Sequence, residues 1–348
     1  MKRTTLEILN DPDLLAARES HFQRLSALYA GETPERPFLL CGIGRVSHEG
    51  DLDWEAWLEE SLDALAAYAK AAINRRAFRP LSLAWGAYGV HFIDHLFGAE
   101  VFELEGGWQA RNLEAPVGAL ERPDLEAIAI WRDLRTFTRA FVEREARGVL
   151  LGLPTIASAL NIAVNLYGQR ILEAMILEPE AARHDLCVIN GVLCDLHRWY
   201  RANLPEEQLQ CVVPTARCQP PGYGQICGCT CQLLSADQYS EFIAPLDAQV
   251  LSIYPRGGMI HLCGAHTQHI PVWREMKELR AVQINHRAAD DLERYFHELR
   301  GDQILYVAPY EKMPLRRVLQ ITDGRRLVVQ TGPQQLIHFL EIADRDLS

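Results

Sequence analysis

Short β-prone runs alternate with amphipathic stretches along most of this 348-residue chain, and the alternation restricts the folds open to it. Apolar residues spaced three and four apart predict helices at residues 54–72, 125–147, 186–203 and 236–254, with Ser235 as a possible N-cap of the last. Strands joined by helices run parallel, because each helix returns the chain to the edge where the previous strand began. The predicted strands are residues 37–42, 81–85, 149–154, 210–214, 259–263, 281–285, 303–308 and 326–330.

Eight such repeats favour closure of the sheet, so we predict an α/β fold of the (β/α)8 TIM barrel type. We treat residues 1–348 as a single domain, with residues 1–35 as an N-terminal helical extension. An open doubly wound sheet is the alternative, but the segment Cys41-Gly42-Ile43-Gly44-Arg45 lacks the third glycine of a nucleotide-binding turn. Residues 215–230 form the longest irregular segment, which we expect to be a loop at the barrel mouth.

Composition narrows the classes of partner. The formal net charge is −11 and no basic cluster is present, which argues against nucleic acid and anionic membranes. No apolar N-terminal segment resembles a signal peptide, and no run reaches the roughly 20 apolar residues of a membrane span, so we expect a cytoplasmic protein. Five of the nine cysteines lie between Cys211 and Cys231, which suits reduced thiols or a metal site better than disulfides.

His261 and Cys263 are the strongest candidates for chemistry. They lie two positions apart in an apolar run that ends at Gly264, so in a strand an imidazole and a thiol would share one face. Both side chains are good zinc ligands. The same spacing is also compatible with a buried strand that carries a hydrogen-bonded histidine and an inert cysteine.

A second cluster, Cys227-Gly228-Cys229-Thr230-Cys231, places three thiols at alternate positions. In an extended segment these thiols would lie on one side, and a loop folded over the barrel mouth would bring them to His261 and Cys263. A zinc site could result, although reduced structural cysteines and an iron–sulfur cluster are the alternatives. Zinc deprotonates a bound thiol at neutral pH, and methyl transfer to sulfur needs such a thiolate.

Other chemical side chains follow the predicted strands, where a barrel places its active site. We assign substrate orientation to the charged and phenolic ones and cofactor binding to two others. Each also has an ordinary interpretation as core packing or as a solvated loop residue. The candidates are Arg45, Tyr310 and Glu311 for catalysis and Trp85 and Asn285 for cofactor binding, with Cys41 read as a core residue and His286 as an exposed helix start.

The runs at residues 233–245 (LLSADQYSEFIAP) and 259–264 (MIHLCG) resemble the LSP-x-x-Y-x-E-F-x-x-P and H-x-C-G signature of the uroporphyrinogen decarboxylase superfamily, with Ala236 in place of proline. Weaker similarity extends over residues 95–101 and 152–154 and to Asn161. The resemblance implies a (β/α)8 barrel with its site at the carboxyl ends of the strands.

Departures from the signature separate the branches of this superfamily. Its decarboxylases carry an R-Q-A-G-R segment near the first strand and an aspartate after the second, and only Arg45 is carried over here. Its methyltransferases move methyl groups between corrinoid proteins and thiols, with His-x-Cys and a distant C-terminal cysteine as zinc ligands. His261 and Cys263 match the first two, but no cysteine follows Cys263, and Pro333 lies near the equivalent position.

The resemblance therefore implies a zinc-dependent methyltransferase with a small thiol or a corrinoid protein as partner. Either a residue from Cys227, Cys229, Cys231 or Glu311 completes the zinc site, or the site is vestigial. The alternatives are a metal-free decarboxylase for an acidic substrate and a non-catalytic barrel that binds a corrinoid or another tetrapyrrole. A homodimer is allowed, but the sequence does not decide the oligomeric state.

Overall fold

A computed structural model describes residues 3–211, 217–285 and 287–345, and its strands form two parallel sheets and one hairpin. The seven-stranded sheet has the order β3 (Ala77–Phe78), β1 (Phe38–Leu40), β13 (Leu327–Gln330), β12 (Ile304–Val307), β11 (Leu279–Asn285), β10 (Gly258–Cys263) and β9 (Gly224–Cys227). The second sheet has the order β2 (Ile43–Ser47), β4 (Leu81–Trp85), β7 (Val149–Gly152) and β8 (Leu209–Gln210). The antiparallel hairpin comprises β5 (Val101–Leu104) and β6 (Gly107–Ala110).

The two sheets are joined at one side. The Cys41 N–H donates to Phe78 O at 2.9 Å and the Ile43 N–H to Pro80 O at 2.9 Å, so the ladder runs from β1 and β3 into β2 and β4. At the other side, the described residues contain no strand pairing between β8 and β9. Side-chain amides bridge that gap, because the Gln219 N–H donates to Gln210 Oε1 and Gln219 Nε2 donates to Gly224 O. The parallel α/β prediction is confirmed, and closure of the barrel stays a prediction.

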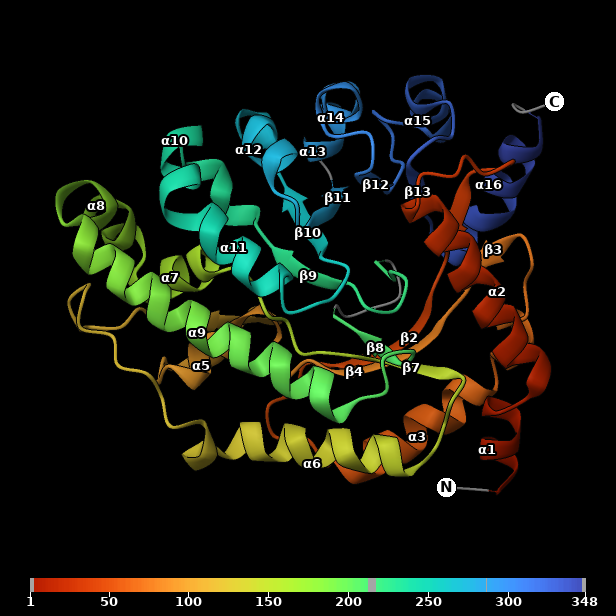
Figure 1. Cartoon of the computed structure of the whole chain (residues 1–348). Coiled ribbons are helices and arrows are strands. Elements are labelled where there is room, and N and C mark those ends of the chain that lie inside the picture. The colour runs from red at the N-terminus through yellow and green to blue at the C-terminus, as the bar shows by residue number, and fades with distance from the viewer. Residues whose placement is uncertain (1–2, 212–216, 286, 346–348) are drawn as a thin grey trace.

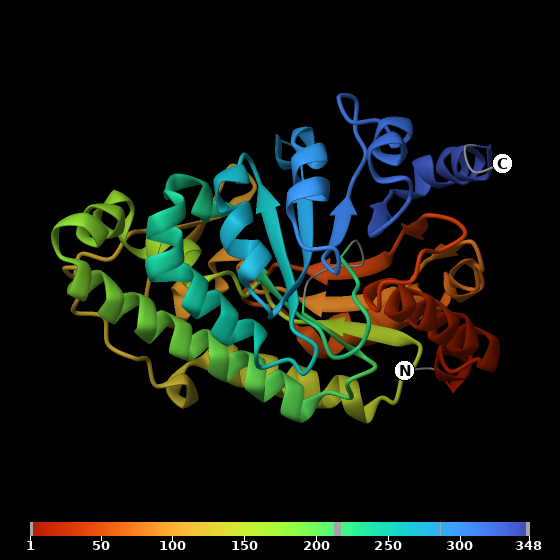
Figure 2. The ribbon, with the colours of Figure 1, turned by 45° about the horizontal axis from the view of Figure 1, so that its top comes forward.

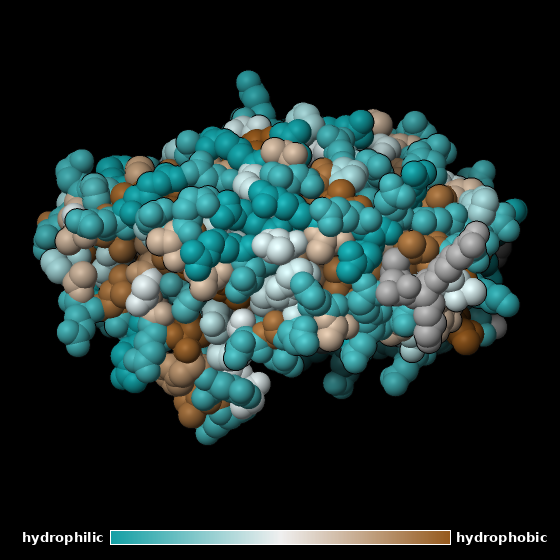
Figure 3. All heavy atoms as spheres, turned by 90° about the horizontal axis from the view of Figure 1, so that it is seen from below, coloured by the Kyte–Doolittle hydropathy of each residue, from teal (hydrophilic) through white to brown (hydrophobic). Residues whose placement is uncertain are grey.

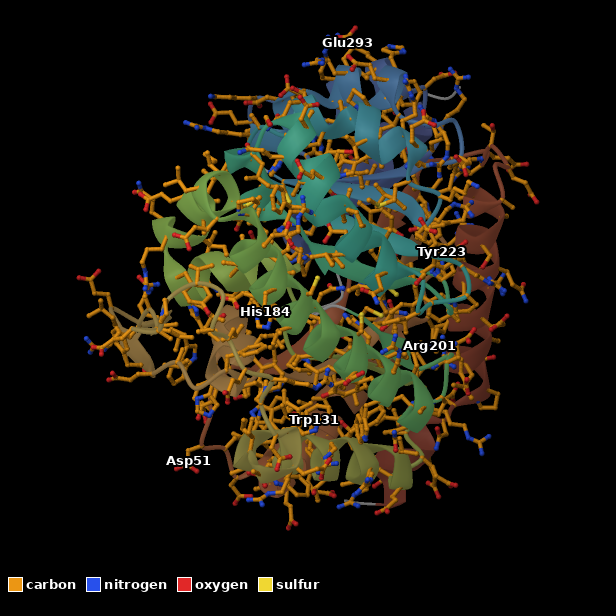
Figure 4. The ribbon with its side chains drawn as sticks, turned by 60° about the vertical axis from the view of Figure 1, so that its left-hand side comes forward. Asp51, Trp131, His184, Arg201, Tyr223 and Glu293 are labelled. Atoms are coloured by element: carbon orange, nitrogen blue, oxygen red, sulfur yellow. The ribbon has the colours of Figure 1, made fainter. Side chains whose placement is uncertain are left out.

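Helices cover the outer faces of both sheets (Figures 1 and 2). Aromatic contacts hold neighbouring helices together, as where Trp131, labelled in Figure 4, packs against Trp199 and Tyr200. The helices are α1 (Arg3–Leu9), α2 (Pro12–Tyr29), α3 (Trp54–Ala66), α4 (Ala69–Ala72), α5 (Phe92–Leu96), α6 (Ala129–Glu143), α7 (Ala159–Tyr167), α8 (Gln169–Leu177), α9 (Pro179–Asn203), α10 (Ala236–Gln238), α11 (Ala244–Leu251), α12 (Ile270–Glu275), α13 (Arg287–Asp290), α14 (Leu292–Glu298), α15 (Leu315–Thr322) and α16 (Pro333–Arg345).

The strands separate two hydrophobic cores. Alternate residues of each strand pack outward against the helices, as Ile260 and Leu262 of β10 do, while Met259 packs inward. The inner core also receives side chains from α2, which therefore closes the inner side of the sheets. The inner core consists of Phe22, Leu25, Leu28 and Tyr29 of α2 together with Phe38, Leu40, Phe78, Leu150, Cys218, Tyr223, Met259, Ala281, Ile304, Tyr306 and Val328.

Each predicted strand and helix overlaps an observed element, and Ser235 forms a capping box with Gln238 at the start of α10. Two predictions are corrected. The 215–230 segment, expected to be a loop, contains strand β9, which the sequence does not indicate because the strand begins at Gly224 and glycine has low β-propensity. Arg45, expected to follow the first strand, lies within β2 because a second strand begins after Gly42. The helices α7 and α8 and the β5–β6 hairpin were not expected. Residues 212–214 of the fourth predicted strand and His286 lie outside the described residues.

Among the described residues, no helix has both the length and the apolar character needed to cross a membrane. Hydrophilic side chains cover most of the face in Figure 3, and hydrophobic ones gather toward its left-hand side.

Candidate metal centre

The candidate metal centre lies where the neighbouring strands β9 and β10 end. His261 is paired with Cys227 across the ladder, and both side chains lie on the inner face, since they alternate with Ile226 and Ile260 of the outer core. After Cys227 the chain turns at Gly228, whose N–H donates to His261 O at 2.9 Å. A Cβ there would lie 2.6 Å from Ile260 Cδ1, so glycine allows the close approach that returns Cys229 to the site.

Three ligand atoms gather at this point. One atom each of Cys227, Cys229 and His261 lies within 4.8 Å of the other two, and the sulfurs of Cys227 and Cys229 are 3.6 Å apart. Cys263 Sγ lies 3.2 Å from His261 Nε2 but outside that group of three. Ligands of a tetrahedral zinc ion with bonds of roughly 2.0 to 2.3 Å are spaced about 3.3 to 3.8 Å apart. The two soft sulfurs and the imidazole fit that ion in type, and the distance between the two sulfurs falls within the expected spacing.

Neighbouring amides orient the ligands. The His261 Nδ1–H donates to Gln283 Oε1, which leaves Nε2 on the side of the thiols, and Gln283 Nε2 donates to Gln330 Oε1 at 3.0 Å. Asn161 Nδ2 donates to Cys227 Sγ at 3.8 Å. Metal-binding histidines commonly donate their second ring N–H to such a partner, which fixes the tautomer and the ring orientation. The contacts of His261 are those expected of a ligand.

The cluster favours negative charge on sulfur. Hydrogen bonding from Cys229 lowers the pKa of the Cys227 and Cys263 thiols against the opposing effect of burial, and nearby His261 and Arg217 lower it further. The same hydrogen bonds raise the pKa of Cys229, which thus keeps a proton between its neighbours. Burial lowers the pKa of Arg217, while the three thiols oppose that shift. A bound cation would replace the shared proton and leave thiolates.

Sequence reasoning missed Gln283 and Arg217. Gln283 lies two residues before Asn285 on β11, so strand periodicity from Asn285 would have placed it on the same face. No local pattern marks Arg217, whose charge acts on the thiols only because the fold places the arginine near them.

Of the other predicted residues, the structure brings Asn285 to the cluster, because it is paired with Cys263 across the ladder. It does not bring Cys231, which is fully buried in the core from the 3₁₀ helix η3 (Cys229–Leu233). A turn of 3₁₀ helix breaks the alternation that would have aligned the three thiols. Cys41 is a core residue, as expected.

The remaining candidates lie elsewhere. Arg45 is exposed and paired with Leu83 of the outer core, so its side chain leaves the outer face of β2. The Trp85 indole is buried against Phe137 of α6 and donates to Glu49 O, which is core packing. Tyr310 donates a hydrogen bond to Asp290. Tyr310 and the exposed Glu311 both line a cavity of about 370 Å³ beside α16.

No family model matches the chain, and no curated protein matches it. Among solved structures, the fold is similar to that of a methyltransferase from Methanosarcina mazei, with a TM-score of 0.62 over 94% of this chain and 98% of that one. Only 11% of the aligned residues are identical, so the likeness is one of fold. This chain therefore has a methyltransferase-like α/β fold with a cysteine–histidine cluster that could hold a metal ion.

Proposed function

We propose that this protein is a zinc-dependent methyltransferase that transfers a methyl group to a thiol. The gathering of Cys227, Cys229 and His261 carries the proposal, because two thiols and an oriented imidazole are a zinc donor set. Fold similarity to a methyltransferase is compatible with it. We also infer that the two sheets form one (β/α)8 barrel of a single domain, because Gln210 and Gln219 bridge the gap between β8 and β9. The sequence runs at residues 233–245 and 259–264 are the support for a relation to the uroporphyrinogen decarboxylase superfamily.

Zinc, when bound, would keep a thiol substrate as a thiolate at neutral pH. Cys227, Cys229 and His261 would hold it, and Gln283 would keep the His261 ring in place. Arg217 would balance the negative charge of the sulfurs. Cys263 lies beside this set and is the candidate for a fourth ligand that a substrate thiol displaces.

The methyl donor would bind on the inner side of the sheets, where Asn285 also lies. The inner-face residues that end the strands of the second sheet are small, namely Val46, Ala84 and Gly152. A corrinoid carried by a partner protein and a methylated small molecule are both compatible with this arrangement. A metal-free decarboxylase has less support, because Arg45, the arginine carried over from the decarboxylase signature, lies on the outer face.

Metal content tests the proposal. We expect about one zinc per chain in protein purified without chelator, by analogy with three-ligand catalytic sites. Cys229→Ser should lose most of that zinc, whereas Cys231→Ala should keep it, because Cys231 belongs to the core. Zinc-loaded protein should also accelerate methylation of 2-mercaptoethanol by methyl iodide. Equal zinc in C229S and wild type would contradict the ligand assignment, and absence of acceleration would contradict the function.

A further inference from the structure

A histidine–aspartate pair lies in the segment that follows β4, away from the metal ligands. His91 ends the short 3₁₀ helix η1 (Gly89–His91), and its Nδ1 is 2.6 Å from Asp94 Oδ2 in the first turn of α5. The Asp94 side chain is fully buried, whereas that of His91 keeps 13% of its exposure. With Nδ1–H donated to the carboxylate, Nε2 is the ring nitrogen left for other chemistry.

Asp94 is held as an orienting group. Asn165 Nδ2 donates to Asp94 Oδ2 at 2.8 Å, while the buried Oδ1 has no hydrogen-bond partner in the described part of the chain. Burial raises the pKa of Asp94, and the hydrogen bond from His91 opposes that shift. Because this buried carboxylate accepts the Nδ1–H, it fixes the tautomer and the ring orientation of His91.

One helix connects the pair to the metal centre. Asn161 and Asn165 are both on α7, four residues apart on one face and about 6 Å apart along the axis. Asn161 donates to Cys227 Sγ, and Asn165 donates to Asp94. The helices α5 and α7 lie side by side (Figure 1). His91 is therefore linked to the thiols through Asp94 and the two asparagines of α7, and it lies on a segment that follows the carboxyl end of β4.

The backbone before His91 is strained. Tyr88 has φ of +58° and Gly89 has φ of +57°, and a left-handed tyrosine costs free energy that the surrounding contacts must offset. The Tyr88 ring packs against His95 and Trp108 and lies over Gly50, where a Cβ would be 2.0 Å from the ring. Such packing holds the loop, and His91 with it, in one conformation.

We propose that His91, oriented by Asp94, is the general acid that protonates the leaving group of the methyl donor. This inference rests on the proposed methyltransferase function. In the step, the substrate thiolate attacks the methyl carbon, the bond from carbon to the donor oxygen breaks, and its electron pair stays on oxygen. That oxygen takes the proton from His91 Nε2, and the neutral imidazole keeps its Nδ1–H bond to Asp94.

Separation from the metal suits this role. In an in-line displacement, the leaving oxygen lies on the side of the methyl carbon opposite to the attacking sulfur. The general acid that protonates this oxygen must therefore lie away from the metal ligands. A methyl group on iodide or on a corrinoid leaves without needing a proton, whereas an ether oxygen is a poor leaving group unless it is protonated. The pair therefore indicates a donor in which the methyl group is bound to oxygen.

Leaving-group dependence tests the inference with zinc-loaded full-length protein and 2-mercaptoethanol as the acceptor. The donors are methyl iodide and a series of aryl methyl ethers with phenols of different acidity. His91→Gln should lower the ether rate by about 100-fold or more and leave the methyl iodide rate within about twofold. The loss should grow as the phenol becomes less acidic. His91→Asn is measured in parallel, so that the result does not depend on one variant.

A matched control is His184→Gln on α9 (His184 is labelled in Figure 4), since His184 also contacts an aspartate but its side chain is half exposed. Its rates should equal those of wild type. If wild type accelerates methyl iodide transfer but not ether transfer, or if His91→Gln changes both donors equally or neither, the inference is wrong while the proposed function stands. If wild type accelerates neither donor, the proposed function fails, and the inference fails with it.

The positioning role of Asp94 has a readout that needs neither metal nor turnover. In ¹⁵N-histidine-labelled protein, the His91 ring should show a strongly hydrogen-bonded Nδ1 proton, which is assigned among the histidine signals by its loss in His91→Gln. Asp94→Asn should shift that proton upfield, because an amide accepts a weaker hydrogen bond than a carboxylate does. A resonance that Asp94→Asn leaves in place would show that Asp94 does not orient His91.

Discussion

At the scale of single residues, the candidate centre depends on side chains that bind no metal themselves. His261 can present Nε2 to the thiols only while Nδ1 donates to Gln283. Gln283 is in turn held by its own contact with Gln330, so the ring orientation is set by a chain of amides across β10, β11 and β13. The types of the ligands are visible in the sequence, but this support comes from neighbouring strands.

Replacing Gln283 tests that support. Gln283→Ala should weaken zinc binding by about 10- to 100-fold, because the His261 ring loses the partner that fixes its tautomer. Competition with a chromophoric chelator measures the affinity. Gln268→Ala is the matched control, since Gln268 donates to Leu234 O and not to a ligand. Unchanged affinity in Q283A would mean that His261 is oriented by other contacts or does not bind the metal.

At the scale of elements, α2 has a structural role that its sequence does not announce. Its side chains Phe22, Leu25, Leu28 and Tyr29 enter the inner core between the sheets, and the Tyr29 hydroxyl donates to Tyr306 of β12 at 3.1 Å. The N-terminal helical extension was expected, but its function as a cover of the inner core follows only from the packing. The inner core to which α2 contributes also contains Met259 and Ala281 of the neighbouring strands β10 and β11.

Replacing a buried side chain on the apolar face of α2 by alanine should therefore lower the free energy of unfolding as much as such a replacement does in any hydrophobic core. Leu25→Ala should lower the free energy of unfolding by about 2 to 5 kcal/mol, because Leu25 is fully buried and leaves a cavity. Gln23→Ala on the outer side of the same helix should change it by less than about 0.5 kcal/mol. Urea unfolding measures both. A cost for L25A as small as that of Q23A would show that α2 does not cover the core.

At the scale of the whole molecule, buried ionisable groups link stability to pH. His197 of α9 is fully buried, and its Nδ1 lies 2.7 Å from the Tyr254 hydroxyl after α11. Burial lowers the pKa of His197 from 6.5 to about 3. Burial also raises the pKa of Asp247 to about 7. The contribution of Asp247 to the free energy of unfolding therefore rises as the pH falls, opposite to that of His197. The difference in the free energy of unfolding between wild type and a variant that lacks one of these groups isolates the contribution of that group.

The sign for His197 follows from proton uptake. Between pH 6.5 and about 3 the unfolded chain holds a proton on this histidine that the folded protein does not, so its contribution is present above pH 6.5 and is lost as the pH falls. The loss approaches about 1.4 kcal/mol per pH unit. His197→Gln should remove this part of the slope in urea unfolding measured from pH 7 to 4, whereas His184→Gln, on the surface, should not. Parallel profiles for H197Q and wild type would contradict the assignment.

The sequence by itself determined the parallel α/β fold and the shared face of His261 and Cys263, because strand periodicity and helix periodicity are local properties. It also pointed to the 227–231 cluster as the source of further ligands. Only the tertiary structure decided which thiols arrive. Strand β9 ends at Cys227 and the chain turns into η3, so Cys229 returns to the site while Cys231 rotates into the core. The same holds for Arg45 and Trp85, because the face that each side chain occupies depends on where its strand begins and bends. It also holds for Arg217, whose charge acts on the thiols only in the folded chain.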